Sequence, residues 1–351
     1  MVSKSVNVSP LEAAPERLVE ADGTTHYGRY RTPFAHANLI DAPFHHLPRP
    51  IRRLRLKEWQ ALQLSAPGFF ASFALFDAKA MTLVQAKVYE SATGKKIAHE
   101  WKLRPFAFRL ADQIVSSTNT YRDDRGVMTF TNDVADGRIV LEVDLRATRT
   151  LPRICGRVEV ATDRGAFQVV SLPFEESGSM VSHKGMFPVS GTITVGDRTT
   201  RLRPDEAGAL LDDHKGYYPY VMRWDWVTSA ALRDGSVLGF NLTKNQCKGS
   251  ERLNENCAWR GDRIAVLPAV TFEREKERAQ GETWRIRDRE GRVDVLFTPA
   301  IPGDVRVNAI IVESRYRGPF GTFRGRIAPE GMEAITLDDW FGMGEDFWLR
   351  C

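Results

Sequence analysis

The chain has 351 residues, of which 42% are hydrophobic and 27% charged, and its net charge is +4 at pH 7. This length is more than one hydrophobic core usually serves, so we expect two domains. Lysine and arginine are interspersed with aspartate and glutamate, which argues against a nucleic-acid partner. We see no leader peptide and no run near the ~20 apolar residues of a membrane span, and we therefore expect a cytoplasmic protein.

In chain order, the first distinctive segment is the basic run from Arg49 to Lys57. It predicts a solvated strand face; contact with a phosphate or a lipid headgroup, and so peripheral membrane association, is the alternative. The four cysteines, Cys155, Cys247, Cys257 and Cys351, have no CxxC spacing, so a zinc site is not expected. A bridge between Cys247 and Cys257 stays open, although reduced thiols suit a cytoplasmic protein better.

Most of the remaining chain alternates between apolar and polar residues, with many β-branched and aromatic side chains, which predicts strands. The predicted strands are Phe69–Phe76, Met81–Glu90, Arg138–Leu145, Ala166–Phe174, Ser236–Thr243, Arg292–Thr298 and Arg306–Tyr316. Glycines at the joints supply hairpin turns. Only Leu11–Glu20 and Pro204–Leu211 have the pattern of short helices. We therefore expect an all-β protein built from antiparallel sandwiches or barrels.

The polar segment from Asp197 to Gly208 separates two strand-rich halves and contains Pro204. Such a segment is typical of a domain boundary. We expect an N-terminal extension over residues 1–25, an N-terminal β domain over residues 26–196, and a C-terminal β-barrel domain over residues 197–351.

The segment from Leu210 to Asn256 concentrates carboxylates, aromatic rings and amides, as a ligand pocket requires. If the run from Tyr217 to Thr228 is a strand, its even-numbered residues share one face. These residues are Tyr218, Tyr220, Met222, Trp224 and Trp226. This face is either a core-facing aromatic stripe or the wall of a ligand cavity.

Three polar residues of this segment are catalytic candidates. Asp225 lies beside Arg223 on the opposite face, where it forms either a structural ion pair or an acid. Asp213 and His214 precede the strand and are suited to general acid–base work, or alternatively belong to a polar rim. Neighbouring residues on an extended chain point apart, so these two do not form a ready-made dyad.

Further polar residues follow on the next strands, where an inward side chain is costly unless it is paired. We expect Asn241, Asn256, Trp259 and Glu345 to bind substrate together with the aromatic face.

Motifs for cofactors and metals are missing from the sequence. The glycine-rich stretch from Gly318 to Gly325 lacks the lysine of a phosphate loop. There is no GxSxG nucleophile motif, and none of the seven histidines has a metal-ligand spacing. We therefore expect neither a metal nor a cofactor.

As a set, several motifs resemble a bacterial family known as domain of unknown function 2804. They are GYYPYVMRWDWVTSA, DGSVLGFNL, ENCAW, GRVDVLFTP, GPFGTFRG and the closing GMGEDFW. The motifs GRYRTPFAHANL and LRLKEWQAL extend the resemblance over nearly the whole chain from Gly28. The acidic pair and tryptophan that close the family pattern correspond to Glu345, Asp346 and Trp348, whereas the loop from Cys247 to Arg252 departs from it.

That family is distantly similar to carotenoid hydratases and to lipocalin-like fungal cyclases that close polyketide rings. The resemblance implies two calycin-like β-barrel domains with an apolar pocket in or between them. It transfers no catalytic residue, because the hydratase motifs do not align with this chain position by position.

Two classes of function compete. The first is a cofactor-independent hydratase or cyclase for an apolar, isoprenoid- or polyketide-like substrate, with a buried carboxylic acid whose pKa is raised by desolvation. The second is a lipocalin-like carrier of a hydrophobic ligand, which needs no acid. An unpaired carboxylate in the cavity favours the enzyme, whereas pairing or exposure of Asp213, Asp225 and Glu345 favours the carrier. We adopt the enzyme as the prediction.

Overall fold

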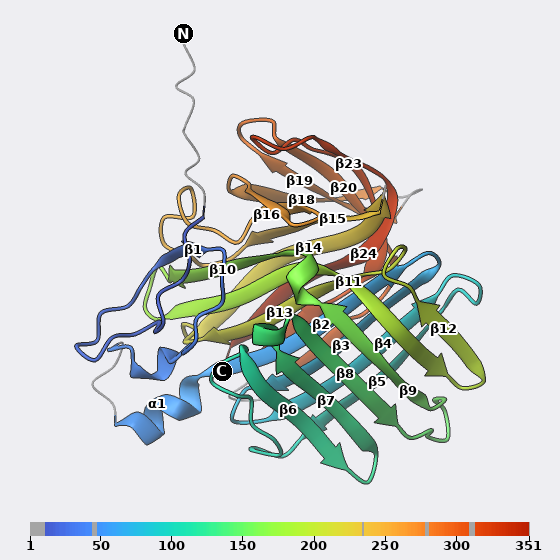
Figure 1. Ribbon diagram of the computed structural model, residues 1–351, viewed down its shortest axis with the longest axis horizontal. Coiled ribbons are helices and arrows are strands. Elements are labelled where there is room, and N and C mark those ends of the chain that lie inside the picture. The colour runs from blue at the N-terminus through green and yellow to red at the C-terminus, as the bar shows by residue number, and fades with distance from the viewer. Residues whose placement is uncertain (1–10, 44–47, 234, 278–280, 309–312, 351) are drawn as a thin grey trace.

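The computed structural model describes residues 11–43, 48–233, 235–277, 281–308 and 313–350. The described chain is dominated by antiparallel strands in two sheets, which confirms the all-β prediction (Figure 1). Helical structure in these ranges comprises α1 (Arg49–Arg55) and three 3-10 turns, η1 (Leu39–Asp41), η2 (Val134–Asp136) and η3 (Thr162–Arg164). No helix among these residues has the length and apolar character to cross a membrane.

One segment predicted as a strand face is a helix, and two segments predicted as helices are not helical. The basic run forms α1 rather than a strand face, because Pro50 in the first turn has a backbone angle suited to a helix start. The segment Leu11–Glu20 makes isolated bridges instead of a helix. The segment Pro204–Leu211 runs through a turn into a strand, where pairing with neighbours on both sides overrides its local preference.

In the described residues, the first sheet has 13 strands, and ten of them lie in the order β5-β4-β3-β2-β13-β11-β9-β8-β7-β6. Strands β10 and β12 pair with β11, and β1 pairs with β10. The bounds are β1 (Gly28–Tyr30), β2 (Lys57–Ala66), β3 (Phe69–Asp77), β4 (Thr82–Glu90), β5 (Lys95–Leu103), β6 (Ser116–Asp123), β7 (Gly126–Asp133), β8 (Arg138–Leu145), β9 (Ile154–Ala161), β10 (Ala166–Pro173), β11 (Ser179–Val195), β12 (Arg198–Leu202) and β13 (Gly208–Gly216).

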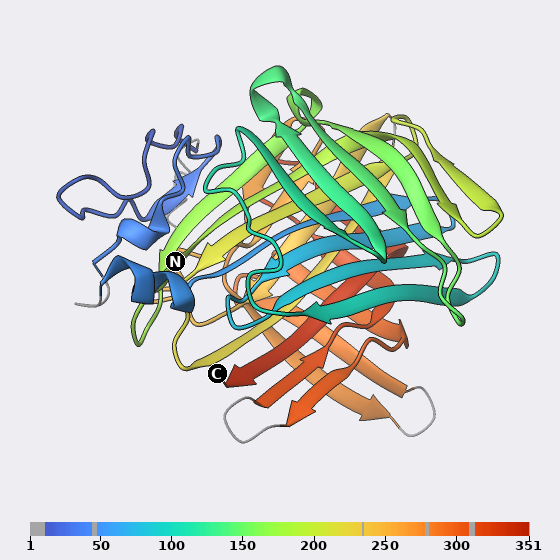
Figure 2. The same ribbon diagram turned by 90° about the horizontal axis from the view of Figure 1, so that it is seen from below.

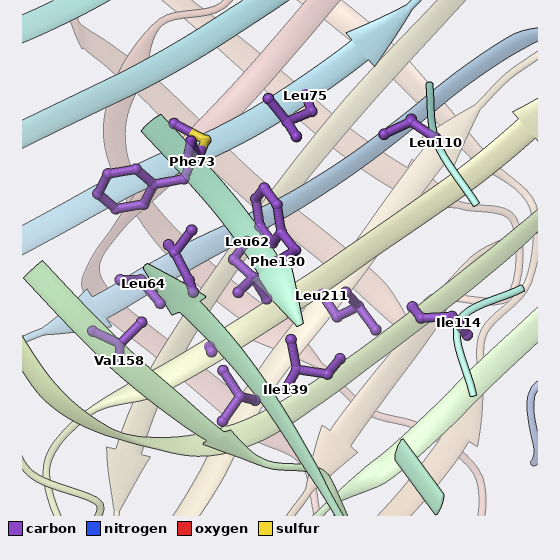
Figure 3. Packing of buried hydrophobic residues seen from close by; sticks show 14 of the residues in the cluster. Leu62, Leu64, Phe73, Leu75, Leu110, Ile114, Phe130, Ile139, Val158 and Leu211 are labelled. Carbon is purple, nitrogen blue, oxygen red and sulfur yellow. The ribbon is translucent and has the colours of Figure 1, made fainter. Parts of the chain in front are cut away.

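This sheet curls around its own core. Leu62 of β2 and Phe73 of β3 pack in one cluster with Phe130 of β7 and Ile139 of β8 (Figure 3). In the same interior, Gln60 of β2 forms hydrogen bonds of 2.6 Å with Asn119 of the edge strand β6 and with Asn132 of its neighbour β7. Strand β2, in the middle of the sheet, therefore contacts β6 and β7 across the curl.

The N-terminal segment joins this core rather than extending from it. Residues 1–10 of the expected extension lie outside the described residues. Leu18 and Val19 are fully buried in the first core, because the chain from Glu12 to Thr25 bridges to itself and to the segment that follows. The described part of the expected extension over residues 1–25 thus contributes side chains to the first core, while the division of the chain into domains stays a prediction.

In the described residues, the second sheet has 11 strands, with the order β17-β16-β15-β14-β24-β23-β20-β19-β18 and with β22 and β21 attached through β24. The bounds are β14 (Val221–Arg233), β15 (Ser236–Lys244), β16 (Cys257–Arg260), β17 (Arg263–Val266), β18 (Val270–Glu277), β19 (Gly281–Asp288), β20 (Val293–Ile301), β21 (Val305–Asn308), β22 (Glu313–Arg317), β23 (Phe320–Ile327) and β24 (Ile335–Arg350). It encloses a separate apolar core that includes Trp284 and Phe297.

The chain passes from one sheet to the other between Gly216 and Val221. The sequence predicts a domain boundary near residue 197, whereas β12 and β13 belong to the first sheet because both pair with β11. The sheet boundary therefore lies later than the sequence indicated. The division into two independently folding domains, and their likeness to calycins, stay predictions.

The two sheets pack face to face. In Figures 1 and 2 the orange and red strands of the second sheet lie beside the blue-to-green strands of the first. Met186 of β11 and Leu210 of β13 join one buried cluster with Trp226 of β14 and Trp259 of β16. Gly239 of β15 makes room for this contact, since a Cβ there would overlap the Met186 sulfur.

Gly239→Ala should therefore destabilise the protein. The added methyl would meet Met186 and come within 2.7 Å of the Ser229 carbonyl oxygen. Overpacking of this kind typically costs about 1–3 kcal/mol of unfolding free energy. Urea unfolding should show a smaller cost in a Met186→Ala background, where the sulfur is gone. Equal costs in the two backgrounds would mean that Met186 does not pack on Gly239 in solution.

Candidate active site

A cavity of about 420 Å³ lies between the two sheets. The first sheet contributes residues from β2, β3, β4, β5, β11 and β13, and the second contributes residues from β14, β15, β22 and β24. Strand alternation explains the lining: Trp59, Ala61 and Gln63 of β2 face the cavity, while Leu62 and Leu64 face the first core. The volume is in the range of small-molecule sites.

Five of the predicted site residues meet at this cavity. They are His214, Tyr218, Trp224, Trp226 and Glu345. Two other predicted residues do not line it: Tyr220 is 58% exposed, because it lies in a bend before β14 begins, and Met222 packs in a neighbouring buried cluster. The predicted aromatic strand therefore supplies part of one wall.

Two predicted catalytic residues lie outside the lining. Asp213 is on the opposite face of β13 from His214, where its carboxylate is 3.0 Å from Nδ1 of His183. Asp225 is on the opposite face of β14 from the two tryptophans and forms an ion pair with Arg274. Strand alternation thus turns both carboxylates away from the cavity.

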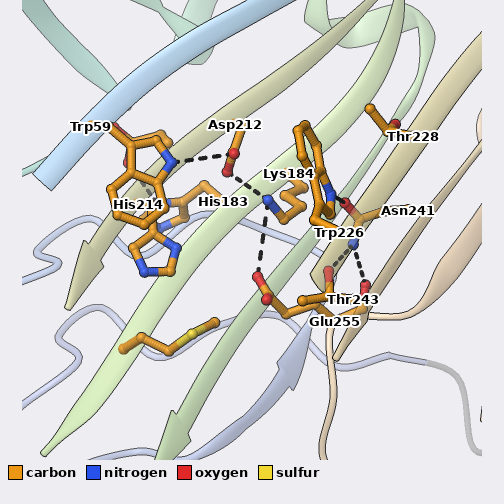
Figure 4. A network of polar contacts seen from close by, with 12 residues as sticks. Trp59, His183, Lys184, Asp212, His214, Trp226, Thr228, Asn241, Thr243 and Glu255 are labelled. Atoms are coloured by element: carbon orange, nitrogen blue, oxygen red, sulfur yellow. Dashed lines mark hydrogen bonds and ion pairs between the residues drawn. The ribbon is translucent and has the colours of Figure 1, made fainter. Parts of the chain in front are cut away.

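Asn241, Asn256 and Trp259 support the wall from behind. Asn241 Oδ1 accepts a hydrogen bond from Trp226 Nε1 at 2.6 Å (Figure 4). Asn256 Oδ1 accepts from the Thr243 amide at 2.6 Å, and Trp259 Nε1 donates to the Ala166 carbonyl at 3.0 Å. Their polar groups are satisfied within the protein, so they position the lining rather than contact a ligand.

The first polar centre of the cavity is Glu345 on β24. Its Oε2 accepts from Trp224 Nε1 at 2.9 Å, and its Oε1 accepts from the Tyr316 hydroxyl at 2.8 Å. Among the described residues, no lysine or arginine forms an ion pair with Glu345. Burial raises the pKa of this carboxyl above its ordinary value, against the lowering effects of the two hydrogen bonds and of the Lys87 charge, and the charge of Asp212 raises it further.

The second polar centre joins both sheets through Lys184 of β11 (Figure 4). Lys184 Nζ is 2.6 Å from Asp212 Oδ1 and 3.9 Å from Glu255 Oε1. Burial alone would lower the pKa of Lys184, but the two carboxylates raise it, so the ammonium is charged at neutral pH. Burial raises the pKa of Glu255, opposed by the Lys184 charge.

His214 lies beside this second centre. Its ring stacks on Trp59 at a centroid distance of 3.9 Å, and its Nε2 is 2.7 Å from the Tyr218 hydroxyl. Burial, together with the charge of Lys184, holds the pKa of His214 well below 6.5, so the imidazole is neutral at pH 7. Its Nδ1 is buried and has no hydrogen-bond partner among the described residues.

Sequence reasoning missed several polar residues of the cavity: Trp59, Lys184, Asp212, Glu255 and Tyr316. The usable signal was Lys184, because it follows a period-two pattern with Met180 and Met186 and so shares a face with two apolar side chains. A charged residue on such a face is rarely buried unless it is paired. Its partners come from other strands, which the local pattern does not reveal.

No three histidine, cysteine, aspartate or glutamate side chains gather as metal ligands in the described ranges. Cys247 and Cys257 are buried free thiols, so the bridge between them that the sequence left open is not formed. The polar groups of the cavity are suited to exchanging protons and to binding oxygen atoms of a ligand.

Glu345→Gln should change how stability depends on pH. The pKa of Glu345 is raised above 4.5 in the folded state, so the folded carboxyl stays protonated where the unfolded one has ionised. The unfolding free energy of the wild type should therefore fall relative to that of the variant as pH rises from about 4.5 through the raised pKa. The fall is about 1.4 kcal/mol for each unit of the shift. Urea unfolding between pH 4 and pH 8 measures it.

The control is Glu176→Gln, because Glu176 lies exposed in a bend. The difference in unfolding free energy between Glu176→Gln and the wild type should stay nearly constant over this pH range. A constant difference between the wild type and Glu345→Gln would show that Glu345 ionises equally in the folded and unfolded states.

Comparison with known proteins gives a family but no activity. The family model described as Domain of unknown function (DUF2804) matches residues 11–350. No curated protein matches the sequence. Among solved structures, kievitone hydratase from Nectria haematococca is similar over 84% of this chain and 88% of its own, with 10% identity and a TM-score of 0.39, a likeness too remote to transfer a function. Because the family model covers nearly all of the sequence, the chain belongs to the DUF2804 family.

Proposed function

We propose that this protein is a cofactor-independent enzyme that acts on an apolar, isoprenoid- or polyketide-like molecule, as a hydratase or a cyclase. One observation carries the proposal: Glu345 places a half-buried carboxyl with a raised pKa on the wall of a cavity, and no ion pair holds it among the described residues. A neutral carboxylic acid in an apolar site is the group that can protonate a carbon–carbon double bond.

The surroundings of Glu345 suit proton donation. When the proton leaves, negative charge develops on the carboxylate, and the Trp224 indole and the Tyr316 hydroxyl are already placed to donate to it. Hydrogen bonds to an anion are stronger than those to a neutral acid. The two donors therefore stabilise the state after transfer more than the state before it, which lowers the barrier.

Aromatic side chains line the space in which a carbocation would form. Trp224 lies 4.1 Å from the ring of Phe347 between centroids, and Trp226 lines the same cavity. A desolvated cation over an indole face gains roughly 2 kcal/mol. The shaped apolar wall also holds a flexible substrate in one conformation, which a ring closure requires.

The proton balance of a hydration fits the cavity. Glu345 delivers a proton to one alkene carbon, water adds to the neighbouring carbon, and the proton that this water releases needs a base. The neutral imidazole of His214 can accept it. In a cyclisation the same acid acts, but a second double bond of the substrate captures the cation, and the new cation then loses a proton to the base to give a neutral product.

The structure also bears on the carrier alternative. The carboxylates of Asp213 and Asp225 are paired and lie outside the cavity lining, whereas Glu345 lines it. A carrier of hydrophobic ligands gains nothing from a buried carboxyl, which costs folding free energy. A perturbed acid in a cavity is more often functional than structural, and this favours the enzyme.

Glu345→Gln should remove proton transfer and keep binding. The wild type, incubated in D₂O with limonene, myrcene, geraniol and the compounds extracted from the purified protein, should place deuterium on carbon in at least one of them. Mass spectrometry measures the label. The variant should be slower by roughly 10²–10⁴-fold, the usual contribution of a general acid. Its affinity for the neutral fluorophore N-phenyl-1-naphthylamine should be retained.

Asp225→Asn is the matched control, because it makes the same carboxyl-to-amide change outside the cavity lining. It should retain the labelling rate. Labelling by Glu345→Gln at the wild-type rate would exclude Glu345 as the acid. Tight fluorophore binding by a wild type that labels none of these compounds would favour the carrier.

A further inference from the structure

Lys184 and Glu255 leave a gap between them on the wall of the cavity. The distance from Lys184 Nζ to Glu255 Oε1 is 3.9 Å, which is too long for a direct hydrogen bond. Both residues line the cavity, and both are at least 95% buried, with exposed fractions of 4%. The gap therefore lies away from bulk solvent.

Each side of the gap keeps unused hydrogen-bonding capacity. The ammonium of Lys184 has three N–H groups and gives one to Asp212. Glu255 Oε1 is buried and has no hydrogen-bond partner among the described residues. The Ser182 hydroxyl lies close enough to Glu255 to lower the pKa of that carboxyl as a donor, but it is buried and makes no hydrogen bond of normal distance and angle among the described residues. A buried unsatisfied oxygen calls for an occupant.

Other contacts hold the two groups in place. Glu255 Oε2 accepts from Asn245 Nδ2 at 3.0 Å. Asp212, which anchors Lys184, also accepts from Trp59 Nε1 at 3.2 Å through its second oxygen. These bonds oppose a rotation of Glu255 or Lys184 that would close the gap.

We infer that Lys184 and Glu255 form a subsite for one neutral oxygen, of a water molecule or of a ligand hydroxyl. An oxygen at about 2.8 Å from both atoms would span the 3.9 Å gap. It would accept a hydrogen bond from Lys184 Nζ and form a second hydrogen bond with Glu255 Oε1. This inference rests on the proposed function, in which such an oxygen is the attacking water or the hydroxyl of the alcohol it forms.

The charge balance selects a neutral oxygen over an anion. The positive charge of Lys184 is already matched by Asp212 at 2.6 Å. A carboxylate or phosphate ligand would bring a second negative charge next to Asp212 and Glu255 in a site of low dielectric, which is unfavourable. This subsite therefore suits an alcohol or a phenol group rather than an acid.

The subsite and the proposed acid serve the same cavity. The charges of Glu255 and Glu345 both raise the pKa of the Tyr218 hydroxyl, after the larger effect of burial, so Tyr218 lies near both centres. Hydration needs an acid at one carbon and an oxygen at its neighbour. Glu345 and the Lys184–Glu255 pair line one cavity as two separate polar centres, so one ligand can contact an acid and an oxygen there.

A pair of probes with the same carbon skeleton tests the subsite without any turnover. The probes are limonene and α-terpineol, which differ by one water molecule, and displacement of N-phenyl-1-naphthylamine measures their affinities. The wild type should bind α-terpineol about tenfold more tightly than limonene, since a hydrogen bond to a charged group contributes roughly 1.5–3 kcal/mol, part of which is lost in removing the hydroxyl from water.

Glu255→Gln should reduce this preference to about twofold or less. Asn245 donates to Oε2, so the amide oxygen takes that position and the NH₂ group replaces the acceptor Oε1. Asp225→Asn, outside the lining, should keep the preference. Equal affinities for the two probes in the wild type, or an unchanged preference in Glu255→Gln, would overturn the subsite. If the wild type prefers α-terpineol over limonene but turns over no substrate, the result would support the subsite and count against the proposed enzymatic function.

A crystal structure of the wild type covers the case in which Glu255→Gln does not fold. With α-terpineol bound, the alcohol oxygen should lie within hydrogen-bond distance of Lys184 Nζ and Glu255 Oε1. With limonene bound, a separate water at this position would identify a water site, whereas its absence would identify a site for the ligand hydroxyl. A direct Lys184–Glu255 hydrogen bond in both crystals would overturn the inference.

Discussion

Strands β11 and β13 are buried on both of their faces, and the candidate site follows from this constraint. All nine residues of β13 and the first eleven of β11 are buried. One face completes the core of the first sheet, and the other packs against the second sheet. Polar residues on the second face cannot reach bulk water, so they must bond one another or a ligand. A single curled sheet with a solvated outer face would have left the same residues on an ordinary surface.

The charged groups between the two sheets differ in how closely an opposite charge neutralises them, and their pKa values differ accordingly. Lys184 and Asp212 neutralise each other at 2.6 Å. Glu255 is farther from the ammonium, at 3.9 Å, and Glu345 has hydrogen-bond donors but no ion pair among the described residues. Burial therefore raises the pKa of both glutamates while Lys184 stays charged. One enclosed space thus holds a fixed cation beside two carboxyls that can carry protons.

The pattern of residues along the chain predicted the features that depend on neighbouring residues alone, namely the bounds of a strand and the face on which a side chain lies. Alternation located β4, β8 and β15 to within a residue or two, and it placed Trp224 and Trp226 correctly on one face. It did not locate the passage between the sheets, because β13 is assigned by its pairing with β2 and β11 rather than by its own residues. Asp213 and Asp225 were attractive for their residue type, but each is one position away from the cavity face. In a strand, a shift of one position moves a side chain to the opposite face of the sheet, so it decides whether that side chain lines the site.

The residues that define the site come from strands of both sheets and from the loops between them, and no segment of the chain carries more than a part of it. Lys184 meets Asp212 through strand pairing within the first sheet, whereas Glu255 reaches it from a loop that belongs to the second sheet. Glu345 depends on Trp224 and Tyr316, its neighbours on the strands at either side of β24. Each carboxyl therefore derives its proton affinity from side chains that sequence order keeps far apart. Assembly of the two sheets is thus the step that creates the chemistry, and a change that loosens their contact should alter the pKa of Glu345 and of Glu255 together.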